Sequence, residues 1–379
     1  MSKKILISTA LSGFLKVFLE KDVLILQSLG YEVHFASNNT IDSEKYVPYF
    51  EKMGIVFHQV DFSSNKPFSR NTLHCYRQFS DILKREHFDA VHIHTPIPGV
   101  IGRLAANRFR RKGMKVLYTT HGFYFHKKSS LKTKLLYKPV EYIMSAMTDA
   151  VITINREDYA AAVKMLCPNV YRVPGMGVDV RKFHDTLIDR EAYRKSLGIR
   201  DNAFVILSVG ELTRRKNHRV VIEALGECAI QDAVFVICGE ALTDDDTKQQ
   251  LVELASANNV DLRLLGHRND IPELCKCSDI GVLPSLREGL GLAGIEMLAS
   301  GMPIVASGIH GIVDYVIDGY NGFLADPLNR KDFADKIKKL YDPEIRNRLS
   351  LNCYASTEPF NIEKAKESME KIYSEVLAY

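Results

Sequence analysis

The chain has 379 residues, of which 46% are hydrophobic and 25% are charged. These are the values of an ordinary globular protein, and they exclude an intrinsically disordered chain, a collagen-like repeat and a small disulfide scaffold. Because a single hydrophobic core stops growing at about 250–300 residues, the length predicts two domains.

The two halves of the chain differ in charge, although the formal net charge is only +4. Residues 1–185 contain 27 Lys and Arg against 16 Asp and Glu, whereas residues 186–379 contain 23 against 30. We therefore expect the basic half to face an anionic partner. The seven cysteines show neither a disulfide framework nor the spacing of a metal site, which favours a reducing compartment.

Short apolar segments rich in β-branched residues alternate with amphipathic segments along the chain. The predicted strands are Lys4–Ser8, Glu32–Ala36, Val56–Val60, Ala90–His94, Lys115–Thr120, Ala150–Ile154, Val170–Val173, Phe204–Val209, Ala233–Cys238, Leu262–Leu265, Ile280–Pro284 and Pro303–Ser307. The helical patterns include Phe14–Leu29, Asn71–Glu86, Leu135–Met147, Arg219–Leu225, Thr247–Ala257, Gly291–Leu298, Arg330–Leu340 and Asn361–Val376. Near-continuous apolar strands separated by helices indicate parallel sheets covered on both faces.

This alternation occurs twice, on either side of a loop-like stretch at Pro174–Asp201. The sequence therefore predicts an α/β chain of two doubly wound, Rossmann-like domains that face each other across a cleft. Residues 1–182 form the expected first domain and residues 183–360 the second. Ligands of such folds bind at the carboxyl ends of the strands, so residues that follow strands are the candidates for a site.

Two segments imitate targeting or membrane signals. Lys3 and Lys4 precede an apolar run, but charged residues follow it at once and no small-residue cleavage site is visible, which favours a first buried strand. The stretch Leu290–Val313 has the length of a membrane span, but its five glycines and Pro303 favour helix, turn and strand. We expect a cytoplasmic protein that is soluble or peripheral.

The sharpest motif is Glu288-Gly-Leu-Gly-Leu-Ala-Gly-Ile-Glu296, which follows a predicted strand. Glycines let backbone N–H groups approach a ligand closely, and a helix N-terminus favours an anion such as phosphate. The two carboxylates are placed to hold two ends of one ligand. Sugar hydroxyls suit them, because an ionised carboxylate accepts hydrogen bonds.

The same segment matches G-x-G-x-x-G at Gly289, Gly291 and Gly294, with Asp314 at the distance of a ribose-binding acid. This keeps a dinucleotide-binding site open, although the turn does not follow its strand directly. A glycine-rich turn with two surface glutamates is the structural alternative.

A second candidate site follows the first strand of the second half. Gly210 opens a turn that leads to Arg214, Arg215 and Lys216. These cations suit a diphosphate, because Arg offers a planar fork and Lys a point charge. A solvated surface run is the alternative.

Histidines at strand ends form a third candidate. His121 follows the strand Lys115–Thr120 and precedes Gly122, where a neutral imidazole can donate a hydrogen bond to a sugar oxygen. A structural histidine is the alternative. His92 and His94 share one face of their strand, and we interpret them as hydrogen-bonded core residues rather than a metal pair.

A basic tract without any acidic residue lies between Asp89 and Glu141, with aromatic residues among its later cations. Such a segment favours an anionic leaflet, at about 1 kcal/mol per cation near the surface. No nucleic-acid motif accompanies it, and a solvated basic face is the alternative. Its cations are Arg103, Arg108, Arg110, Arg111, Lys112, Lys115, Lys127, Lys128, Lys132, Lys134 and Lys138.

Asp244-Asp245-Asp246 has the D-x-D spacing that can chelate a divalent ion beside a diphosphate. We interpret these residues instead as acids favoured by the dipole of the following helix. We expect no metal site in the protein.

Together these residues resemble a retaining glycosyltransferase of glycosyltransferase family 4, with the GT-B fold, over nearly the whole chain. The most specific piece is the E-x7-E element at Glu288 and Glu296. The other matching segments, in family order, are Thr120-His121-Gly122, Asn155–Asp158, Val173–Asp179, Gly210–Lys216 and Asp318–Pro327. The subgroup that the chain resembles comprises bacterial capsule, exopolysaccharide and glycoprotein-glycan enzymes.

The resemblance implies a role for each site residue. Arg215 and Lys216 would bind the nucleotide diphosphate and stabilise it as the leaving group, Glu288 would hold donor-sugar hydroxyls, and Glu296 would bind the ribose. The remaining nucleotide-sugar contacts would come from Gly13, Gly210, Arg268 and the backbone of Gly289, Leu290, Gly291 and Leu292. Among these, Gly13 would lie beside the phosphates and Arg268 would contact the base. His121 would contact the donor sugar near the reacting carbon.

Two departures from the family pattern concern the phosphate contacts. The family's first loop often has paired glycines, whereas here only Gly13 appears. Gly210 is followed by Glu211 where the family often has Arg, so Arg214 or Arg215 must substitute.

The resemblance implies metal-independent transfer with retention, without a cofactor, from a nucleotide sugar to a hydroxyl of a lipid-diphosphate-linked glycan acceptor. We expect a UDP-sugar as donor, with N-acetylhexosamine among the candidate sugars. The first domain would bind the acceptor and meet the inner face of the membrane through the basic tract at 103–138, and the helix at about 361–379 would cross back onto it. A sugar-nucleotide epimerase, an NAD-dependent dehydrogenase and a non-catalytic membrane adaptor are the alternatives.

Overall fold

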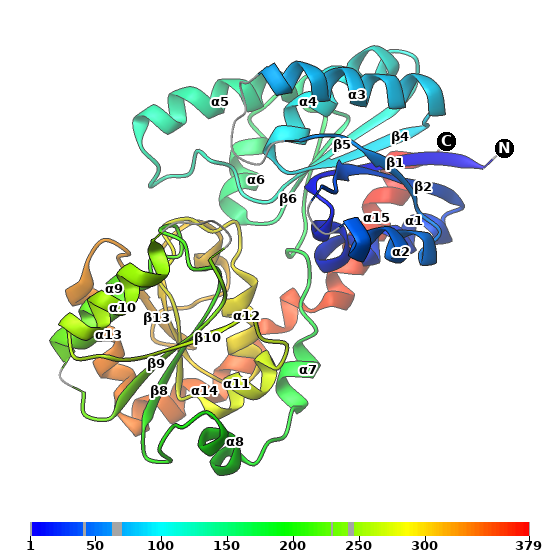
Figure 1. The fold of residues 1–379 in the computed structure, drawn as a ribbon. Coiled ribbons are helices and arrows are strands. Elements are labelled where there is room, and N and C mark those ends of the chain that lie inside the picture. Colours follow the sequence, from blue (N-terminus) through cyan, green and yellow to red (C-terminus); the bar gives the residue numbers. More distant parts are fainter. Residues whose placement is uncertain (1, 41–42, 63–69, 229, 242–245, 379) are drawn as a thin grey trace. The chain divides into compact units, whose positions relative to one another are not determined.

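The computed structural model describes residues 2–40, 43–62, 70–228, 230–241 and 246–378. Asp244 and Asp245 of the D-x-D spacing lie outside this part of the chain. The chain divides into two compact units, which are Met1–Gly177 with Glu363–Tyr379 (unit 1) and Val178–Ile362 (unit 2). The division falls a few residues before the boundary that we expected after residue 182 (Figure 1).

Unit 1 is built on a parallel sheet with the order β3-β2-β1-β4-β5-β6-β7. Its strands are β1 (Lys3–Leu11), β2 (Tyr31–Asn38), β3 (Val56–Gln59), β4 (Ala90–His94), β5 (Lys115–Thr120), β6 (Ala150–Thr153) and β7 (Asn169–Arg172). All five residues of β4 are buried. A central strand is apolar along its whole length because helices cover both of its faces.

The helices of unit 1 lie on both sides of this sheet, with α3 and α4 on one face and α1, α2 and α15 on the other (Figure 1). Their bounds are α1 (Glu20–Ser28), α2 (Ser43–Lys52), α3 (Arg70–Glu86), α4 (Pro96–Arg110), α5 (Leu131–Ser145), α6 (Arg156–Ala162) and α15 (Ile362–Leu377). The helix expected at Phe14–Leu29 is divided, because Leu15–Leu19 form a π-helical turn before α1 begins.

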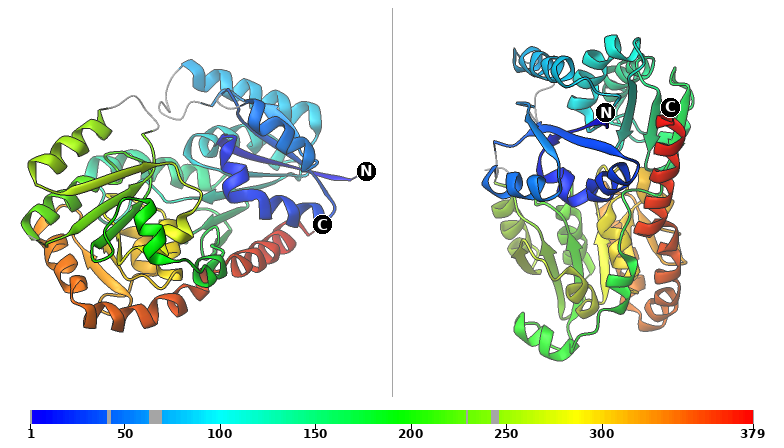
Figure 2. Two further views of the ribbon diagram at one scale, coloured as in Figure 1. Left: turned by 60° about the horizontal axis from the view of Figure 1, so that its bottom comes forward. Right: turned by 90° about the vertical axis from the view of Figure 1, so that its right-hand side faces the viewer.

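The C-terminal helix α15 is tied to unit 1 by one buried tyrosine. The Tyr373 hydroxyl donates to Asp22 Oδ1 of α1 at 3.2 Å and lies 2.8 Å from His92 Nδ1 of β4. Tyr373 is fully buried. The helix therefore runs beside the first elements of the chain, from which it is separated by the whole of unit 2 in sequence (Figure 2).

Unit 2 repeats the architecture with the order β10-β9-β8-β11-β12-β13. Its strands are β8 (Phe204–Val209), β9 (Ala233–Cys238), β10 (Asp261–Gly266), β11 (Ile280–Leu283), β12 (Ile304–Ser307) and β13 (Gly322–Ala325). Every strand pair of the two sheets is parallel. The prediction of two doubly wound α/β domains is therefore confirmed.

The helices of unit 2 also form two layers, with α9, α10 and α13 on one face of the sheet and α11, α12 and α14 on the other (Figure 1). Their bounds are α9 (His218–Cys228), α10 (Thr247–Ala257), α11 (Ile271–Cys277), α12 (Leu292–Ala299), α13 (Arg330–Tyr341) and α14 (Pro343–Thr357). Two short 3₁₀ turns lie at His310–Asp314 and Glu358–Phe360.

The loop expected at Pro174–Asp201 was wrong in part, because it contains helices α7 (Val180–Asp185) and α8 (Arg190–Ser196). N-terminal capping residues account for both helices. The side chain of Asp179 accepts from the Lys182 amide, and that of Asp189 accepts from the Ala192 amide. Buried Arg194 then fastens α8 to unit 2, as its guanidinium donates to Cys277 O at 2.8 Å and Asp279 Oδ2 at 2.9 Å.

Each strand expected from the sequence is present, with ends that differ by up to three residues, but β13 was missed. The helices named from the sequence did not include α2, α4, α6, α11 and α14. The strand β13 has only four residues and two of them are Gly and Ala, so it carries little apolar signal. The described part of the chain contains no helix that is both long and apolar enough to span a bilayer.

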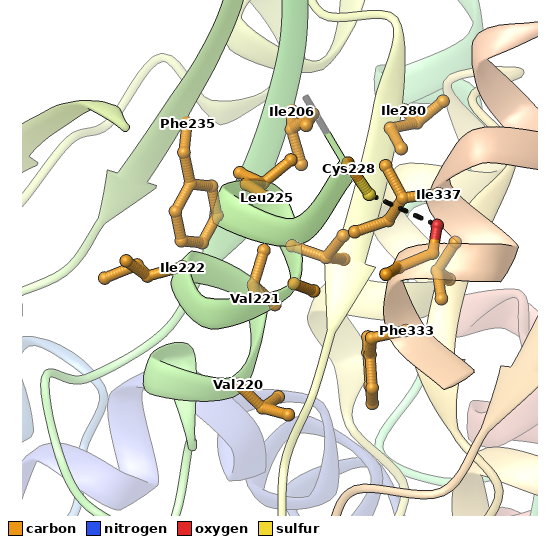
Figure 3. Close-up of a cluster of buried hydrophobic side chains, with 14 of the residues drawn as sticks. Ile206, Val220, Val221, Ile222, Leu225, Cys228, Phe235, Ile280, Phe333 and Ile337 are labelled. Atoms are coloured by element: carbon orange, nitrogen blue, oxygen red, sulfur yellow. Dashed lines mark hydrogen bonds between the residues drawn. The ribbon is translucent and has the colours of Figure 1, made fainter. Parts of the chain in front are cut away.

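The core of unit 2 lies between β8, β9, α9 and α13. Ile206, Val221, Phe333 and Ile337 are fully buried and pack together (Figure 3). The Cys228 thiol donates to the carbonyl of Ala334 at 3.3 Å, which joins the end of α9 to α13. This thiol is a small buried side chain rather than a reactive one, and its pKa is raised to about 11 by burial.

Replacing Phe333 by Ala is expected to lower the free energy of unfolding by about 3–5 kcal/mol, because a fully buried ring leaves a cavity between α9 and α13. Urea unfolding followed by circular dichroism measures this change. Leu351→Ala is the control, since Leu351 is 83% exposed. Equal unfolding midpoints for the two variants would contradict the assignment of this core.

Candidate functional site

The candidate residues of unit 2 meet where the strand order of its sheet reverses. The neighbours β8 and β11 lie at the centre of the order, and the chain winds away from β8 in one direction and from β11 in the other. Such a switch point leaves the carboxyl ends of two adjacent strands uncovered. The loop after β8 carries Gly210, Arg215 and Lys216, and the loop after β11 carries Glu288.

Three donors converge on one oxygen of Glu288. Lys216 Nζ lies 2.6 Å from Glu288 Oε1, Ser285 Oγ lies 2.9 Å from it, and Arg215 Nη1 lies 3.3 Å from it. Arg215 also donates to the carbonyl of Arg287 at 3.2 Å. The structure thus brings together Arg215, Lys216 and Glu288, which the sequence placed in two separate motifs.

The charged state of Glu288 follows from these contacts. Burial by itself raises the pKa of this carboxyl, but Lys216 and Arg215 outweigh burial and hold the pKa below its usual value. Its second oxygen, Oε2, has no hydrogen-bond partner among the described residues. An ionised carboxylate with one committed and one open oxygen can accept hydrogen bonds from a ligand hydroxyl.

The loops that carry these residues are fixed by backbone contacts. The amide of Leu286 donates to the carbonyl of Arg215 at 2.8 Å. Asn217, whose φ is +56°, donates from Nδ2 to the carbonyls of Pro284 and Pro327. Sequence reasoning missed Ser285 and Asn217 as supports of the site, although both adjoin the motifs it identified.

Two glycines of the Glu288–Glu296 segment have packing roles. Gly291 caps α12 with φ of +82°, and its carbonyl accepts from the Tyr315 hydroxyl at 3.0 Å. A Cβ at Gly294 would lie 2.3 Å from that hydroxyl. Buried Tyr315 therefore requires glycine at position 294.

The start of α12 offers unused donors. The amides of Leu290, Gly291 and Leu292 have no acceptor among the residues that the structure describes. The first amides of any helix lack partners within it and suit an anion. The side chain of Leu290 is buried, so only its backbone is available for binding. Gly289 precedes this turn. A Cβ at Gly311 would lie 1.9 Å from the carbonyl oxygen of Gly289, so the two would overlap.

Glu296 lies on α12 and has a different environment from Glu288. Burial raises the pKa of its carboxyl to about 7, and Lys182 only partly opposes this effect. Near neutral pH Glu288 is therefore ionised, whereas Glu296 is partly protonated. Such a difference commonly marks groups with different tasks.

The loop after β8 contains Arg214 and Arg215, the two expected substitutes for the arginine that the family often has at position 211. Arg215 lies at Glu288 and also 3.6 Å from Glu211 Oε2, so Glu211 takes part in the same charge network. Arg214 is exposed and lines a cavity of about 740 Å³ between the start of α9 and the length of α10. Arg215, and not Arg214, occupies the position beside Glu288.

Gly210 and Arg268 lie at the same edge of the sheet. A Cβ at Gly210 would lie 3.0 Å from Lys216 Cε, so glycine allows the lysine stem to pass close to the backbone. The guanidinium of Arg268 is paired with both oxygens of Asp270, at 2.8 Å and 2.5 Å. Asp270 thus engages Nε and Nη2 of this guanidinium.

In unit 1 the candidate residues also lie at the carboxyl ends of strands. His121 follows β5, and the edge of the Phe14 ring packs on its imidazole with the centroids 4.8 Å apart. Gly13, which adjoins Phe14, is closely packed, since a Cβ there would lie 2.7 Å from the Tyr46 hydroxyl oxygen. The structure therefore brings Gly13 and His121 to neighbouring positions in unit 1.

The loop after His121 is held by acids at the start of α6. Asp158 accepts from the Phe123 amide at 3.1 Å and from Asn155 Nδ2 at 2.8 Å. Glu157 accepts from the Lys127 amide. Asn155 in turn caps α6 by accepting from the Asp158 amide. The Asn155–Asp158 motif thus supports the loop that begins at His121.

His92 and His94 were correctly interpreted as core residues, since both are buried in β4 and make hydrogen bonds. Within the described ranges of the chain, no group of three or more His, Cys, Asp or Glu side chains could hold a metal ion.

The basic tract is not one continuous surface, which corrects the interpretation of two of its members. Arg103 is fully buried, stacked 3.9 Å from the Tyr118 ring centroid and paired with Glu141 at 2.8 Å. Arg110 is paired with Asp149 at 2.9 Å. The remaining exposed cations include Lys127, Lys128, Lys132 and Lys138, at and before α5.

Comparison with known proteins places this arrangement in a family. Residues 25–182 match the description glycosyltransferase family 4, and residues 189–355 match glycosyl transferases group 1. A Bacillus subtilis (strain 168) protein named glycosyltransferase EpsD is 35% identical, over 99% of this chain and 97% of its own length. The Escherichia coli UDP-Gal:alpha-D-GlcNAc-diphosphoundecaprenol alpha-1,3-galactosyltransferase is 33% identical over 78% of each chain.

Solved structures share the fold at lower identity. Anabaena Alr3699/HepE in complex with UDP has a TM-score of 0.77 at 19% identity and covers 98% of this chain and 100% of its own. Sucrose-phosphate synthase from Thermosynechococcus elongatus has a TM-score of 0.80 at 18% identity, with 99% of both chains covered. The chain therefore belongs to glycosyltransferase family 4, and it is a glycosyltransferase with two parallel-sheet α/β domains of the GT-B type.

Proposed function

We propose that the protein transfers a sugar from a UDP-sugar to a hydroxyl of a lipid-diphosphate-linked glycan acceptor, as a step of polysaccharide assembly. The observation that carries this proposal is the convergence of Lys216 and Arg215 on Glu288 at the switch point of unit 2. The relative that acts on a GlcNAc-diphosphoundecaprenol acceptor and the structural neighbour that binds UDP support the choice of substrates.

The proposed roles in unit 2 follow from charge and open hydrogen-bonding groups. Lys216 and Arg215 bind the diphosphate and stabilise the charge that develops on it as the leaving group. The open Oε2 of Glu288 accepts from donor-sugar hydroxyls. The amides of Leu290, Gly291 and Leu292, with the backbone of Gly289 before them, meet the sugar and the distal phosphate. Glu296 accepts from the ribose hydroxyls. The Gly210 loop lies along the phosphates, and Arg268 contacts the base.

In unit 1 we assign to His121 a hydrogen bond to a substrate oxygen, and Gly13 lies beside the phosphates. The proposed reaction needs no metal and no cofactor, and the acceptor hydroxyl attacks from the face that the diphosphate leaves, which retains the configuration. No side chain acts as a nucleophile. The diphosphate departs with the bonding electrons, and the proton of the acceptor hydroxyl leaves with it.

We further propose that α5 rests on an anionic membrane at the inner face of the cell membrane. Leu131, Leu135 and Ile143 of α5 are 72%, 69% and 55% exposed. Lys132 and Lys138 are exposed on the same helix. Exposed apolar side chains flanked by lysines are typical of a helix that lies in the membrane interface. A lipid-linked acceptor would be met at that surface.

A ligand panel tests the proposed donor. Thermal unfolding is measured with UDP, GDP, ADP and NADH, each with and without EDTA. UDP at 100 times its dissociation constant should add about 2.7 kcal/mol to the free energy of unfolding. We expect stabilisation by UDP that EDTA does not change. Stabilisation by NADH alone would instead support a dehydrogenase, and conversion of a UDP-sugar without acceptor would support an epimerase.

Lys216→Met should lower turnover by about 10²–10³-fold, because it removes one donor from the charge on the leaving group. The assay follows UDP release with a UDP-sugar and a lipid-linked acceptor. Lys195→Met is the control, since Lys195 is exposed on α8. Turnover of the Lys216 variant equal to that of the control would remove the central argument for the proposal.

Glu296→Gln should make unfolding stability depend less on pH. Between the ordinary carboxyl pKa of 4.5 and about 7, the folded protein keeps a proton that the unfolded chain has lost. The contribution of Glu296 to stability therefore falls as pH rises through this window and stays low above it. In urea unfolding, the free energy of unfolding of the variant should rise relative to that of the wild type as the pH increases from 5 to 8. If the difference in free energy of unfolding between variant and wild type is the same at pH 5 and pH 8, Glu296 is not held protonated.

Vesicle sedimentation tests the membrane surface. Lys132→Gln with Lys138→Gln should weaken binding to phosphatidylglycerol vesicles by about 30-fold, since two cations contribute about 2 kcal/mol. Lys195→Gln with Lys248→Gln is the control, because both lysines are exposed in unit 2. Binding of the wild type to neutral vesicles with equal affinity would contradict an electrostatic contribution.

A further inference from the structure

His94, at the last position of β4, contacts the site histidine His121. Its Nδ1 lies 3.1 Å from His121 Nε2. His121 follows β5, the parallel neighbour of β4, and His94 pairs in register with Thr119, two residues before His121. His94 is 1% exposed, so this contact is shielded from water. Nothing in its sequence context distinguished it from a packing residue.

The ring of His94 is held in place by a hydrogen-bonded chain that runs through His92. The Tyr373 hydroxyl donates to Asp22, so its oxygen accepts from His92 Nδ1–H at 2.8 Å. The other ring nitrogen of His92 then accepts from the Thr119 hydroxyl at 2.7 Å. The His92 ring lies against that of His94, with centroids 4.1 Å apart. These hydrogen bonds to Tyr373 of α15 and Asp22 of α1 therefore hold the His92 ring, against which the His94 ring packs.

The position of the proton on His94 follows from its second nitrogen. His94 Nε2 is buried and has no partner among the described residues. In protein interiors, a buried backbone carbonyl without a donor is less rare than a buried N–H without an acceptor. We apply the same rule to the ring nitrogens of His94. The proton is therefore on Nδ1, from which it is donated to His121 Nε2.

The same bond decides the state of His121. Burial lowers the pKa of His121 to about 3 and that of His94 well below its usual value, so both rings are neutral near pH 7. Since His121 Nε2 accepts, the single ring proton of His121 is on Nδ1. This nitrogen has no hydrogen-bond partner among the residues that the structure describes.

We propose that His94 is a positioning residue that holds His121 in its Nδ1–H tautomer, with that N–H directed to a substrate oxygen. In this state His121 is a neutral hydrogen-bond donor and its second nitrogen is engaged by His94, so it acts neither as a base nor as a nucleophile. The inference concerns the site of the proposed function and rests on it for the identity of the substrate oxygen.

The tautomer is measured directly in the ligand-free wild-type protein. Nitrogen-15 NMR of histidine-labelled protein distinguishes a protonated from an unprotonated ring nitrogen, and the His121→Asn variant assigns the His121 signals. We expect a protonated Nδ1 and an unprotonated Nε2 at His121 near pH 7. A protonated Nε2 would overturn the proposal. This readout needs no substrate, so it separates failure of the tautomer from failure of the proposed function.

Two substitutions at position 94 test the positioning role. His94→Leu should release His121 to a mixture of tautomers and lower kcat by about 10- to 100-fold, the range for loss of a partner that orients a functional group. KM for the UDP-sugar should change little. In His94→Asn the side-chain amide can donate from the place of Nδ1, so both the NMR signature and most of the turnover should be kept.

The matched control is His34→Leu. His34 is also 1% exposed and bonded to a second histidine, with its Nδ1 2.8 Å from His58 Nε2 across β2 and β3. It should lose stability without changing the His121 signals or kcat. An equal loss of kcat in the His34 and His94 variants, or an unchanged tautomer in His94→Leu, would overturn the proposal. If His94→Leu does not fold, His94→Asn and the wild-type spectrum still decide.

Discussion

In a parallel sheet whose strand order reverses, the connections leave two adjacent strands in opposite directions, and nothing covers the carboxyl ends between them. In unit 2 this point lies between β8 and β11, and in unit 1 between β1 and β4. The chain must place polar residues there, because these backbone ends cannot be buried without partners. Lys216, Glu288 and His94 all occupy positions that this constraint creates.

Burial of charge determines how such a point can serve a ligand. Glu288 is 8% exposed, and an unpaired carboxylate in that position would be costly. Lys216 and Ser285 satisfy one of its oxygens, which keeps the group ionised while the other oxygen stays open. The ion pair is thus both a structural bond between two loops and a preorganised acceptor. Glu296 has no such partner among the residues that the structure describes, and its pKa rises instead.

The sequence motifs contained many residues of this site, but they did not show which side chains contact one another. The glycines and glutamates of the segment 288–296 indicated a turn before a helix, and the turn is present. The run from Arg214 to Lys216 gave three equivalent cations. Only the folded loop shows that Arg215 and Lys216 meet Glu288, while Arg214 lines the cavity beside α10. In the same way, the basic tract counted Arg103 as a surface charge, although it is buried against Tyr118 and Glu141.

The sequence by itself determined the two parallel α/β sheets, because apolar strands and amphipathic helices are local patterns that repeat along the chain. It also determined which residues follow strands, and therefore which could line a site. Tertiary structure alone decided the pairing of Lys216 with Glu288, of His94 with His121 and of Tyr373 with Asp22 and His92. These partners lie 27 or more residues apart in the sequence. Sequence periodicity carries no information about which distant side chains share a hydrogen bond.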